Sequence, residues 1–446
     1  MLRSKLSSVA ASVSRRRFLQ NVGLAVAAGV SFQGGVRAQE KGSIVPAGAT
    51  ALPRFAVISD IHFGIFMGGL LSTIKVSHAL KNIFGKGRID ALFVVGDLTD
   101  GGKVHEYNSL LKVFSDKANV PAGVAVYFMM GNHDHYNKHV NTAKLYKEKL
   151  KQPLNQYAEI KGHAFITLSP TGSGGNDYKN DAKKFLSEKL EFAAKKFPGA
   201  PIFVFFHHPP LETCYGSEKG HWGTAVLTPI LERYPQVVTF SGHSHFPIGD
   251  PRSIHQGKFT AVNDGSTTYT EVLRGEVHEK SIHPEGFDNV TEGLIVNVLG
   301  NGNVEIERWD TFRDEEILPR WLVEAPHDGS RFTYKGERGK LAPAFAGGIK
   351  PVVSDTKEGA CVVTFPQAKD NEVVHHYLIE ILDGEKVIKS VRKCSQFYLN
   401  SWMPAELYVV FSKLPVGKKL TARVTAIDSY KNKSSAIRSE SFSVTA

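Results

Sequence analysis

The chain has 446 residues, of which 42% are hydrophobic and 22% charged. This length predicts more than one domain, because a single hydrophobic core seldom grows so large, and the composition excludes a disordered or collagen-like protein. Residues 1–38 carry six basic side chains and no acidic one, so the formal net charge of +10 falls to +4 for the remainder. That charge is too small to indicate binding to nucleic acid.

The first 38 residues are typical of a targeting segment. Arg15, Arg16 and Arg17 precede an apolar run rich in glycine and alanine at 22–32, and residues 36–38 form a small-x-small cleavage site. The apolar run is too short to span a membrane. The segment resembles a twin-arginine (Tat) signal peptide, the alternative being an arginine-rich tail of a cytosolic protein. The resemblance implies export of the folded protein by the Tat machinery to the bacterial periplasm, with no membrane span once the signal is removed.

Beyond a flexible linker at 39–53, strands and helices alternate, which predicts an α/β domain over residues 54–325. Apolar runs rich in β-formers predict the strands, and apolar residues at helical spacing predict the helices. The Gly-Asn-Gly-Asn run at 300–303 predicts a hairpin. The predicted strands are 54–59, 91–95, 125–130, 164–168, 201–206, 237–240, 260–262, 294–299 and 304–309, and the predicted helices are 70–84, 107–118, 144–150, 181–197 and 226–234.

Polar side chains follow five of these strands at the point where each strand ends. In an open α/β sheet that edge is where ligands bind, so we expect these side chains to gather there. Two carboxylates, an amide oxygen and four imidazoles are too many donors for one metal ion, and mixed nitrogen and oxygen donors suit zinc, manganese or iron rather than calcium. Asp97 stands alone on its loop and is the natural bridge between two ions. The candidate ligands are Asp60, His62, Asp97, Asn132, His207, His243 and His245.

The candidate ligands fall into five sequence blocks. These are DxH at 60–62, GD at 96–97, GNHD at 131–134, a histidine at 207 and GHxH at 242–245. In this order and spacing the blocks resemble those of the calcineurin-like metallophosphoesterase superfamily, over residues 55–308. The resemblance implies a two-sheet β-sandwich flanked by helices, whose strand ends hold two divalent metal ions.

The resemblance also implies a role for each residue. Asp60, His62, Asp97 and His245 would hold the first metal ion, and Asp97, Asn132, His207 and His243 the second. His133 would face the substrate, stabilise the transition state and protonate the leaving oxygen, while Asp134 would orient His133 by a hydrogen bond. Two such ions, about 3.5–4 Å apart, share a hydroxide that attacks the phosphorus atom in line.

Four neighbouring residues carry weaker expectations. His208 follows a ligand but points the other way on an extended chain, so we expect a supporting rather than a ligating role. His135 either lines the substrate cleft or is exposed, and Asp100 is expected to cap or orient its loop. His221 lies in the long loop after the fourth block, where a substrate contact is one alternative.

From residue 346 to 446, after a linker at 326–345, the pattern changes to alternating strands, which predicts an all-β sandwich. Its last part resembles a fibronectin type III module of the immunoglobulin-like class, although Phe365 stands where a core tryptophan is usual and Leu420 where a corner tyrosine is usual. Cys361 and Cys394 either form a disulfide or are two buried thiols. The predicted strands are 360–365, 374–382, 385–391, 407–412 and 419–427.

Together these features predict an exported enzyme, a metal-dependent phosphoesterase acting on a small phosphate ester. The resemblance favours phosphodiesters, because compact members with GHxH resemble bacterial cyclic-nucleotide and glycerophosphodiester phosphodiesterases. The alternatives are a phosphomonoesterase, a binding protein without turnover and, disfavoured by the weak charge, a nuclease. The sequence leaves the metal identities and the oligomeric state open.

Overall fold

The computed structural model describes residues 52–446, apart from residues 66, 219–221, 273–281 and 337. The predicted signal peptide, nearly all of the predicted linker at 39–53, and His221 therefore lie outside the described residues. Leu52–Ala446 form one compact unit. In this described part, no helix combines the length and apolar character that crossing a membrane requires.

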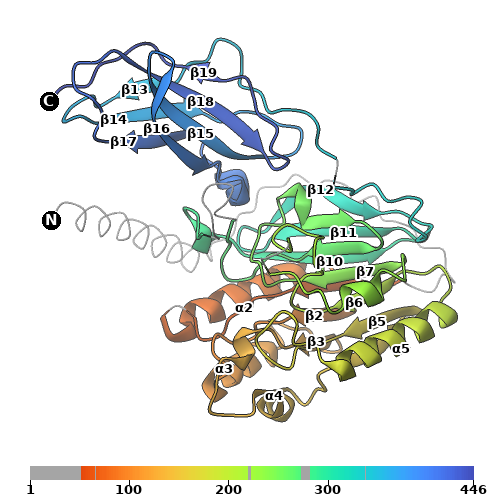
Figure 1. The fold of residues 1–446 in the computed structure, drawn as a ribbon. Coiled ribbons are helices and arrows are strands. Elements are labelled where there is room, and N and C mark those ends of the chain that lie inside the picture. Colours follow the sequence, from red (N-terminus) through yellow and green to blue (C-terminus); the bar gives the residue numbers. More distant parts are fainter. Residues whose placement is uncertain (1–51, 66, 219–221, 273–281, 337) are drawn as a thin grey trace, which may run out of the picture. The chain divides into compact units, whose positions relative to one another are not determined.

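The first sheet has six strands in the order β12-β11-β10-β1-β2-β3 (Figure 1). The strands β1, β2 and β3 are parallel, with Phe55 opposite Ala91 and Leu92 opposite Val126, while β10, β11 and β12 are antiparallel to their neighbours. The parallel strands carry near-continuous apolar runs because both of their faces are covered. Their bounds are β1 Arg54–Ile58, β2 Ala91–Val95, β3 Ala125–Met129, β10 Glu292–Val298, β11 Val304–Asp310 and β12 Glu315–Val323.

The second sheet also has six strands, in the order β4-β5-β6-β7-β9-β8. Its four central strands are parallel and its two edge strands antiparallel. The carboxyl ends of β6 and β7 therefore lie at the same edge of this sheet. The bounds are β4 Gln156–Ile160, β5 His163–Thr167, β6 Ile202–Phe205, β7 Val237–Ser241, β8 Ile254–Gln256 and β9 Thr260–Asn263.

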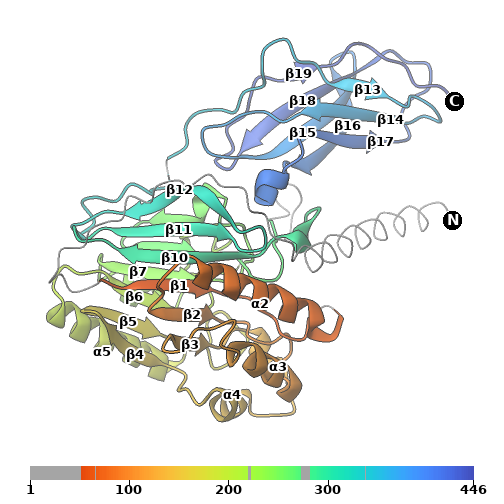
Figure 2. The ribbon, with the colours of Figure 1, turned by 180° about the vertical axis from the view of Figure 1, so that it is seen from behind.

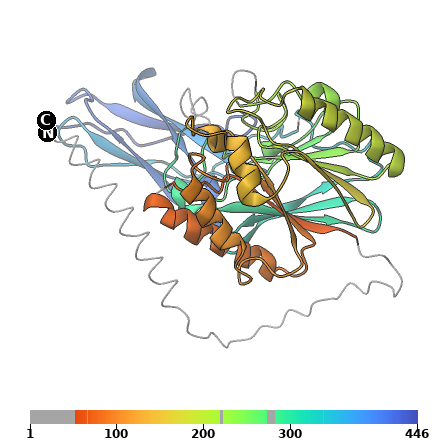
Figure 3. The same cartoon turned by 90° about the horizontal axis from the view of Figure 1, so that it is seen from below.

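The two sheets pack face to face around an aromatic core. Phe55 and Phe93 of the first sheet contact Phe165, Phe203 and Phe205 of the second, and the rings of Phe93 and Phe205 stack with centroids 3.9 Å apart. Helices cover both outer faces: α2 lies against the first sheet (Figure 2), and α2 and α5 lie on opposite sides of the pair (Figure 3). This is the predicted two-sheet sandwich flanked by helices. The helices are α2 Leu70–Gly85, α3 Val104–Phe114, α4 Thr142–Leu150, α5 Asn180–Lys196 and α6 Thr228–Leu231.

The observed elements differ from the predicted ones at a helix end that is set by a capping side chain and at strands on the edges of the sheets. Helix α3 begins three residues before the predicted start, because the Glu106 carboxylate accepts the backbone N–H groups of Gly101 and Lys103 and so caps the first turn. Strands β4, β8 and β12 were not predicted. β12 is an edge strand that accommodates Pro319, a residue that interrupts the strand pattern in the sequence.

The C-terminal strands form two antiparallel sheets, β13-β14-β17 and β16-β15-β18-β19. Phe365, Tyr377 and Leu420 are buried together in one core, so the residues at the unusual positions still serve as core residues. Cys361 and Cys394 are buried and are not joined by a disulfide. The bounds are β13 Val352–Ser354, β14 Cys361–Pro366, β15 Val374–Asp383, β16 Lys386–Cys394, β17 Glu406–Phe411, β18 Leu420–Asp428 and β19 Ile437–Arg438.

Candidate metal centre

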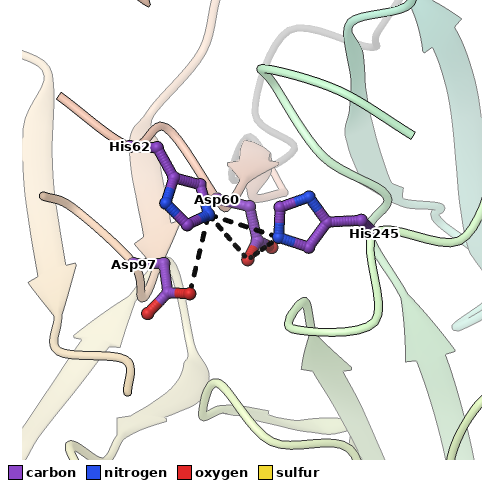
Figure 4. A group of neighbouring side chains, drawn as sticks. All are labelled: Asp60, His62, Asp97 and His245. Carbon is purple, nitrogen blue, oxygen red and sulfur yellow. Dashed lines mark hydrogen bonds and ion pairs between the residues drawn. The ribbon is translucent and has the colours of Figure 1, made fainter. Parts of the chain in front are cut away.

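The loops that follow β1, β2 and β7 bring four of the predicted ligands together (Figure 4). Nε2 of His245 lies 3.1 Å from Oδ1 of Asp60 and 3.2 Å from Nε2 of His62, which is 3.6 Å from Oδ2 of Asp97. The four donor atoms lie within 4.8 Å of one another. This group is identical to the set predicted for the first metal ion.

A second group forms around the same aspartate. Nε2 of His207, from the loop after β6, lies 3.3 Å from Oδ2 of Asp97 and 3.1 Å from Oδ1 of Asn132. A ring nitrogen of His243 lies within 4.8 Å of the donor atoms of Asp97 and His207. Oδ2 of Asp97 therefore faces both groups, which is the geometry that a bridging ligand requires.

The backbone at these positions is held in a conformation that is rare for residues other than glycine. Asp60, His62, Asp97, His243 and His245 all have positive φ angles, between 38° and 69°. Each such residue costs of order 1–3 kcal/mol and persists only when its surroundings hold it in place. Five strained residues at one site indicate that these side chains are held in their orientations at a cost in folding stability.

Backbone groups hold the atoms of the ligands that face away from the centre. The N–H of His133 donates to Oδ1 of Asp97 at 2.8 Å, and the N–H of His243 donates to Oδ2 of Asp60 at 3.0 Å. Nδ1 of His207 lies 2.9 Å from the Val95 carbonyl oxygen, and Nδ1 of His245 lies 3.2 Å from that of Tyr269. Asp60 and Asp97 thus each keep one oxygen for the centre, and His207 and His245 each keep their Nε2, as in metal sites with a supporting outer shell.

Two glycines of the predicted blocks are required by this close packing. A Cβ atom on Gly131 would collide with the Asp97 carboxylate, and one on Gly242 would collide with the carboxylate of Asp60. Glycine therefore lets the neighbouring loops approach the ligands closely.

The residues present fit divalent cations. Oδ1 of Asp60 is buried and has no hydrogen-bond partner among the described residues, although it faces the imidazoles of His62 and His245. Burial favours the neutral carboxyl group, but the charges of His245 and His207 outweigh it and lower the pKa of Asp60 to about 2. A buried carboxylate without a donor of its own is the atom that a metal ion would satisfy.

His133 lies at the cavity side of this cluster and contacts Asp100. Its Nδ1 lies 3.0 Å from the Asp100 carbonyl oxygen and 3.5 Å from the Asp100 carboxylate, and its Nε2 lies 4.0 Å from Oδ2 of Asp97. Burial disfavours the imidazolium, but the bond to Asp100 and the charge of Asp97 raise the pKa of His133 to about 9. These two groups thus favour the imidazolium, the form that a general acid requires.

The predicted role of Asp134 is wrong. The hydrogen bonds of its carboxylate come from the backbone N–H groups of Leu98, Thr99 and Gly131 and from the hydroxyl groups of Thr99 and Tyr107, not from the His133 ring. Asp134 thereby ties the GNHD loop to the Asp97 loop. The residue that contacts the His133 imidazole is Asp100, for which the sequence predicts only a role in capping or orienting its loop.

The other neighbouring histidines are buried. Nδ1 of His208 lies 3.2 Å from the Tyr178 hydroxyl, and burial, reinforced by His207, lowers the pKa of His208 to about 3. Burial thus favours the neutral imidazole of His208, which lies with its ring centroid 4.4 Å from that of His243 and belongs to the cavity wall. His135 contacts Thr142 and the Pro170 carbonyl oxygen, so it holds the loop together rather than contacting the cavity.

A cavity of about 510 Å³ opens directly onto the metal cluster. Its wall includes the ligands Asp97, Asn132, His243 and His245, together with His133. Apart from His208, the remaining wall comes from loops in which the sequence carries no motif, so these residues were not predicted. They include Tyr136, Asn176, Trp222, Tyr269 and Glu271.

Fold and site together define a metal-dependent phosphoesterase domain. Residues 53–247 match the family model "Calcineurin-like phosphoesterase". This part of the chain is thus a calcineurin-like metallophosphoesterase domain, and every predicted ligand lies within it.

Two relatives with assigned names are similar over parts of their lengths. A probable glycerophosphodiester phosphodiesterase of Arcobacter nitrofigilis is 28% identical over 174 residues, which cover 36% of this chain and 58% of that protein. A probable cyclic nucleotide phosphodiesterase of Ruthia magnifica is 25% identical over 198 residues, which cover 43% of this chain and 77% of that protein. Among solved structures, a purple acid phosphatase from seeds of yellow lupin (Lupinus luteus) aligns with a TM-score of 0.45 and 12% identity, over 62% of this chain and 54% of that one.

Proposed function

We propose that this protein is an exported phosphohydrolase that uses two divalent metal ions to cleave phosphodiesters. The observation that carries the proposal is the position of Asp97. Its Oδ2 lies 3.6 Å from Nε2 of His62 in one donor group and 3.3 Å from Nε2 of His207 in the other. One carboxylate shared by two donor groups supports a pair of metal ions rather than a single one.

The two ions would be held by the sets predicted from the sequence, and they would supply the Lewis acidity that activates water and neutralises the phosphoryl oxygens. The protein positions the ester between these ligands and His133. Nδ1 of His133 bonds to Asp100, and its Nε2 lies 4.0 Å from Oδ2 of Asp97, at the cluster onto which the cavity opens. As the bond from phosphorus to the leaving oxygen breaks, that oxygen takes the proton from Nε2, so the charge that develops on it is neutralised.

Diester substrates are supported by the names of the two relatives, both of which are called probable phosphodiesterases. The cavity of about 510 Å³ falls within the range of small-molecule sites and has walls on several sides of the metal cluster. It can therefore receive a second ester group beside the leaving group.

Export and the C-terminal module belong to the same proposal. Export by the Tat machinery to the periplasm rests on Arg15, Arg16, Arg17 and the cleavage site at 36–38. Replacing Arg16 and Arg17 by lysine should leave the uncut precursor in the cytoplasm, whereas normal processing would contradict Tat export. We further propose that residues 346–446 form a fibronectin type III-like module joined through a linker at 326–345.

The test of the activity compares two chromogenic esters on one preparation. Purified protein is stripped of metal with a chelator, reconstituted with manganese or zinc, and assayed with bis-p-nitrophenyl phosphate and p-nitrophenyl phosphate. Metal-dependent hydrolysis of the diester, with two ions bound per chain, is the expected result. Preference for the monoester would make the protein a phosphatase, and no turnover with two ions bound would favour the binding protein.

A further inference from the structure

The C-terminal sandwich contacts the loop that forms one wall of the cavity. His375, on β15, is fully buried, and its Nε2 lies 3.2 Å from the hydroxyl oxygen of Tyr215. Tyr215 belongs to the chain segment between the candidate ligand His207 and Trp222, a residue of the cavity wall. A residue of the sandwich thus binds a residue of the catalytic domain close to the site.

The ring of Tyr215 packs against the residue that follows a candidate ligand. Its centroid lies 4.2 Å from that of Phe246, the residue after His245, and both side chains are buried. Gly216 has a φ of +90°, and a Cβ atom at this position would lie 2.7 Å from the Phe246 ring. The backbone at Gly216 is therefore packed so closely against Phe246 that no side chain fits there.

Trp222 completes this aromatic cluster and reaches the cavity. Its ring lies 5.4 Å from Phe246 and 6.2 Å from His243, in both cases edge to face. The backbone N–H of Trp222 donates to the Gly216 carbonyl oxygen at 3.2 Å. Trp222 is half-buried and lines the cavity beside His243. An indole at this position offers an apolar surface to a group bound next to the metal cluster.

Further contacts hold Tyr215 on the catalytic side of the junction. The guanidinium of Arg252 lies 3.7 Å from the centre of the Tyr215 ring and binds the Asp250 carboxylate. That carboxylate also accepts a hydrogen bond from Ser429 of the sandwich, at 3.1 Å. The contacts across this junction are thus directional polar bonds between buried groups, which fix geometry more strongly than apolar packing does.

We infer that the sandwich is a positioning module for the substrate cavity. His375 fixes Tyr215, and Tyr215 together with Phe246 holds Trp222 in place. Trp222 then forms the wall that contacts the second ester group of the substrate, the one that is not cleaved. This inference rests on the proposed phosphodiesterase function and adds a determinant of specificity to it. The metal ligands are held by their own loops, so the sandwich acts on substrate binding rather than on metal binding. Tyr215 and His375 are positioning residues, because neither lines the metal cluster.

The test uses full-length variants and two diesters with the same leaving group. Bis-p-nitrophenyl phosphate carries an aromatic second ester group, and methyl p-nitrophenyl phosphate carries a methyl group in its place. Tyr215→Phe and His375→Leu remove the bond across the junction, and His375→Gln restores a side chain that can bond the Tyr215 hydroxyl. Tyr377→Phe is the matched control, since its hydroxyl bonds to Gln367 and Ala368 within the sandwich.

We expect Tyr215→Phe and His375→Leu to raise KM for the bis-aryl ester roughly three- to tenfold, the effect of one lost hydrogen bond, with kcat within twofold and the metal content unchanged. KM for the methyl ester should stay close to wild type, and His375→Gln should recover most of the loss. The inference is overturned if Tyr215→Phe behaves like Tyr377→Phe on both esters, or if both variants lose metal.

A second measurement does not depend on turnover. Hydrogen exchange of the amides in 211–217 should become at least about threefold faster in Tyr215→Phe than in Tyr377→Phe, because Tyr215 no longer anchors that segment. If wild type cleaves neither ester, the proposed hydrolysis is wrong. The exchange data still test whether the sandwich is coupled to the segment that holds Tyr215. Equal exchange in the two variants would refute the coupling whatever the activity.

Discussion

The two regions of this protein place their polar groups in opposite ways. In the catalytic domain, five candidate ligands have positive φ angles, and buried atoms such as Oδ1 of Asp60 and Nδ1 of His62 have no hydrogen-bond partner among the described residues. From β13 onward, positive φ angles fall at turns, at strand ends and at Asn400 in the short 3-10 helix Phe397–Trp402. In this described part, Oδ2 of Asp370 is the one buried side-chain atom without a hydrogen-bond partner.

This difference shows in which region folding stability is reduced by the geometry of a functional site. Strained backbone and unpaired polar atoms each cost free energy, so they persist where something other than folding stability has selected them. In the catalytic domain five of the strained residues lie at the strand ends that form the metal centre, and so do the unpaired atoms of Asp60 and His62. Among the described residues from β13 onward, no comparable group of metal-binding side chains is found.

The largest effect should come from breaking the shared ligand. Asp97→Asn removes the negative charge that both donor groups face, so we expect metal and activity to be lost together, by more than the roughly 10- to 100-fold typical of changes outside the ligand shell. Metal content by mass spectrometry and diester hydrolysis measure the two losses. Exposed Asp116→Asn is the matched control, and full activity of Asp97→Asn would contradict the bridging role.

His133→Ala should separate catalysis from metal binding. The side chain donates a proton in the proposed reaction but does not belong to either ligand set, so kcat should fall roughly 10²- to 10³-fold while metal content stays at the wild-type level. His139→Ala, at an exposed position of the same loop, is the control. An unchanged kcat would remove His133 from the mechanism.

Truncating a core residue of the sandwich should lower the stability of the protein without changing metal binding or catalysis. Ile379 on β15 is fully buried, so Ile379→Ala should lower the free energy of unfolding by about 2–5 kcal/mol, measured by urea denaturation. Metal content and kcat of the folded protein should be unchanged, and Val387→Ala, at a site that is 40% exposed, should have little effect on either. Loss of metal in Ile379→Ala would mean that the core of the sandwich also supports the metal centre.

The smallest effect concerns a buried acid of the catalytic domain. Burial, with the nearby charge of Asp310, raises the pKa of Glu292 to about 8. Between pH 5 and pH 7 the unfolded chain has lost this proton while the folded chain retains it, so this group's contribution to stability falls as the pH rises, by about 2 kcal/mol.

Glu292→Gln should abolish that part of the pH dependence. The free energy of unfolding of the variant, relative to wild type, should rise between pH 5 and pH 7, whereas exposed Glu232→Gln should run parallel to wild type. Parallel curves for Glu292→Gln and wild type would show that Glu292 is ionised in the folded protein.

Much of the fold could be predicted, because buried parallel strands are continuous apolar runs. The runs before Asp60, Asp97 and His207 are of this kind, and each became a central strand. Edge strands were harder, since they are shorter or carry residues such as Pro319 that interrupt the pattern. Helix ends also escaped prediction where a side chain such as Glu106 supplied the cap.

The sequence by itself determined which donors are available, because DxH, GNHD and GHxH state residue types and spacing along single loops. It could not determine contacts between loops. The exchange of roles between Asp134 and Asp100, the aromatic wall at Trp222 and the bond between Tyr215 and His375 all join segments that are distant along the chain. Tertiary structure decided these features, since the orientation of a side chain depends on which backbone groups its neighbours leave unpaired, and a linear pattern does not record that.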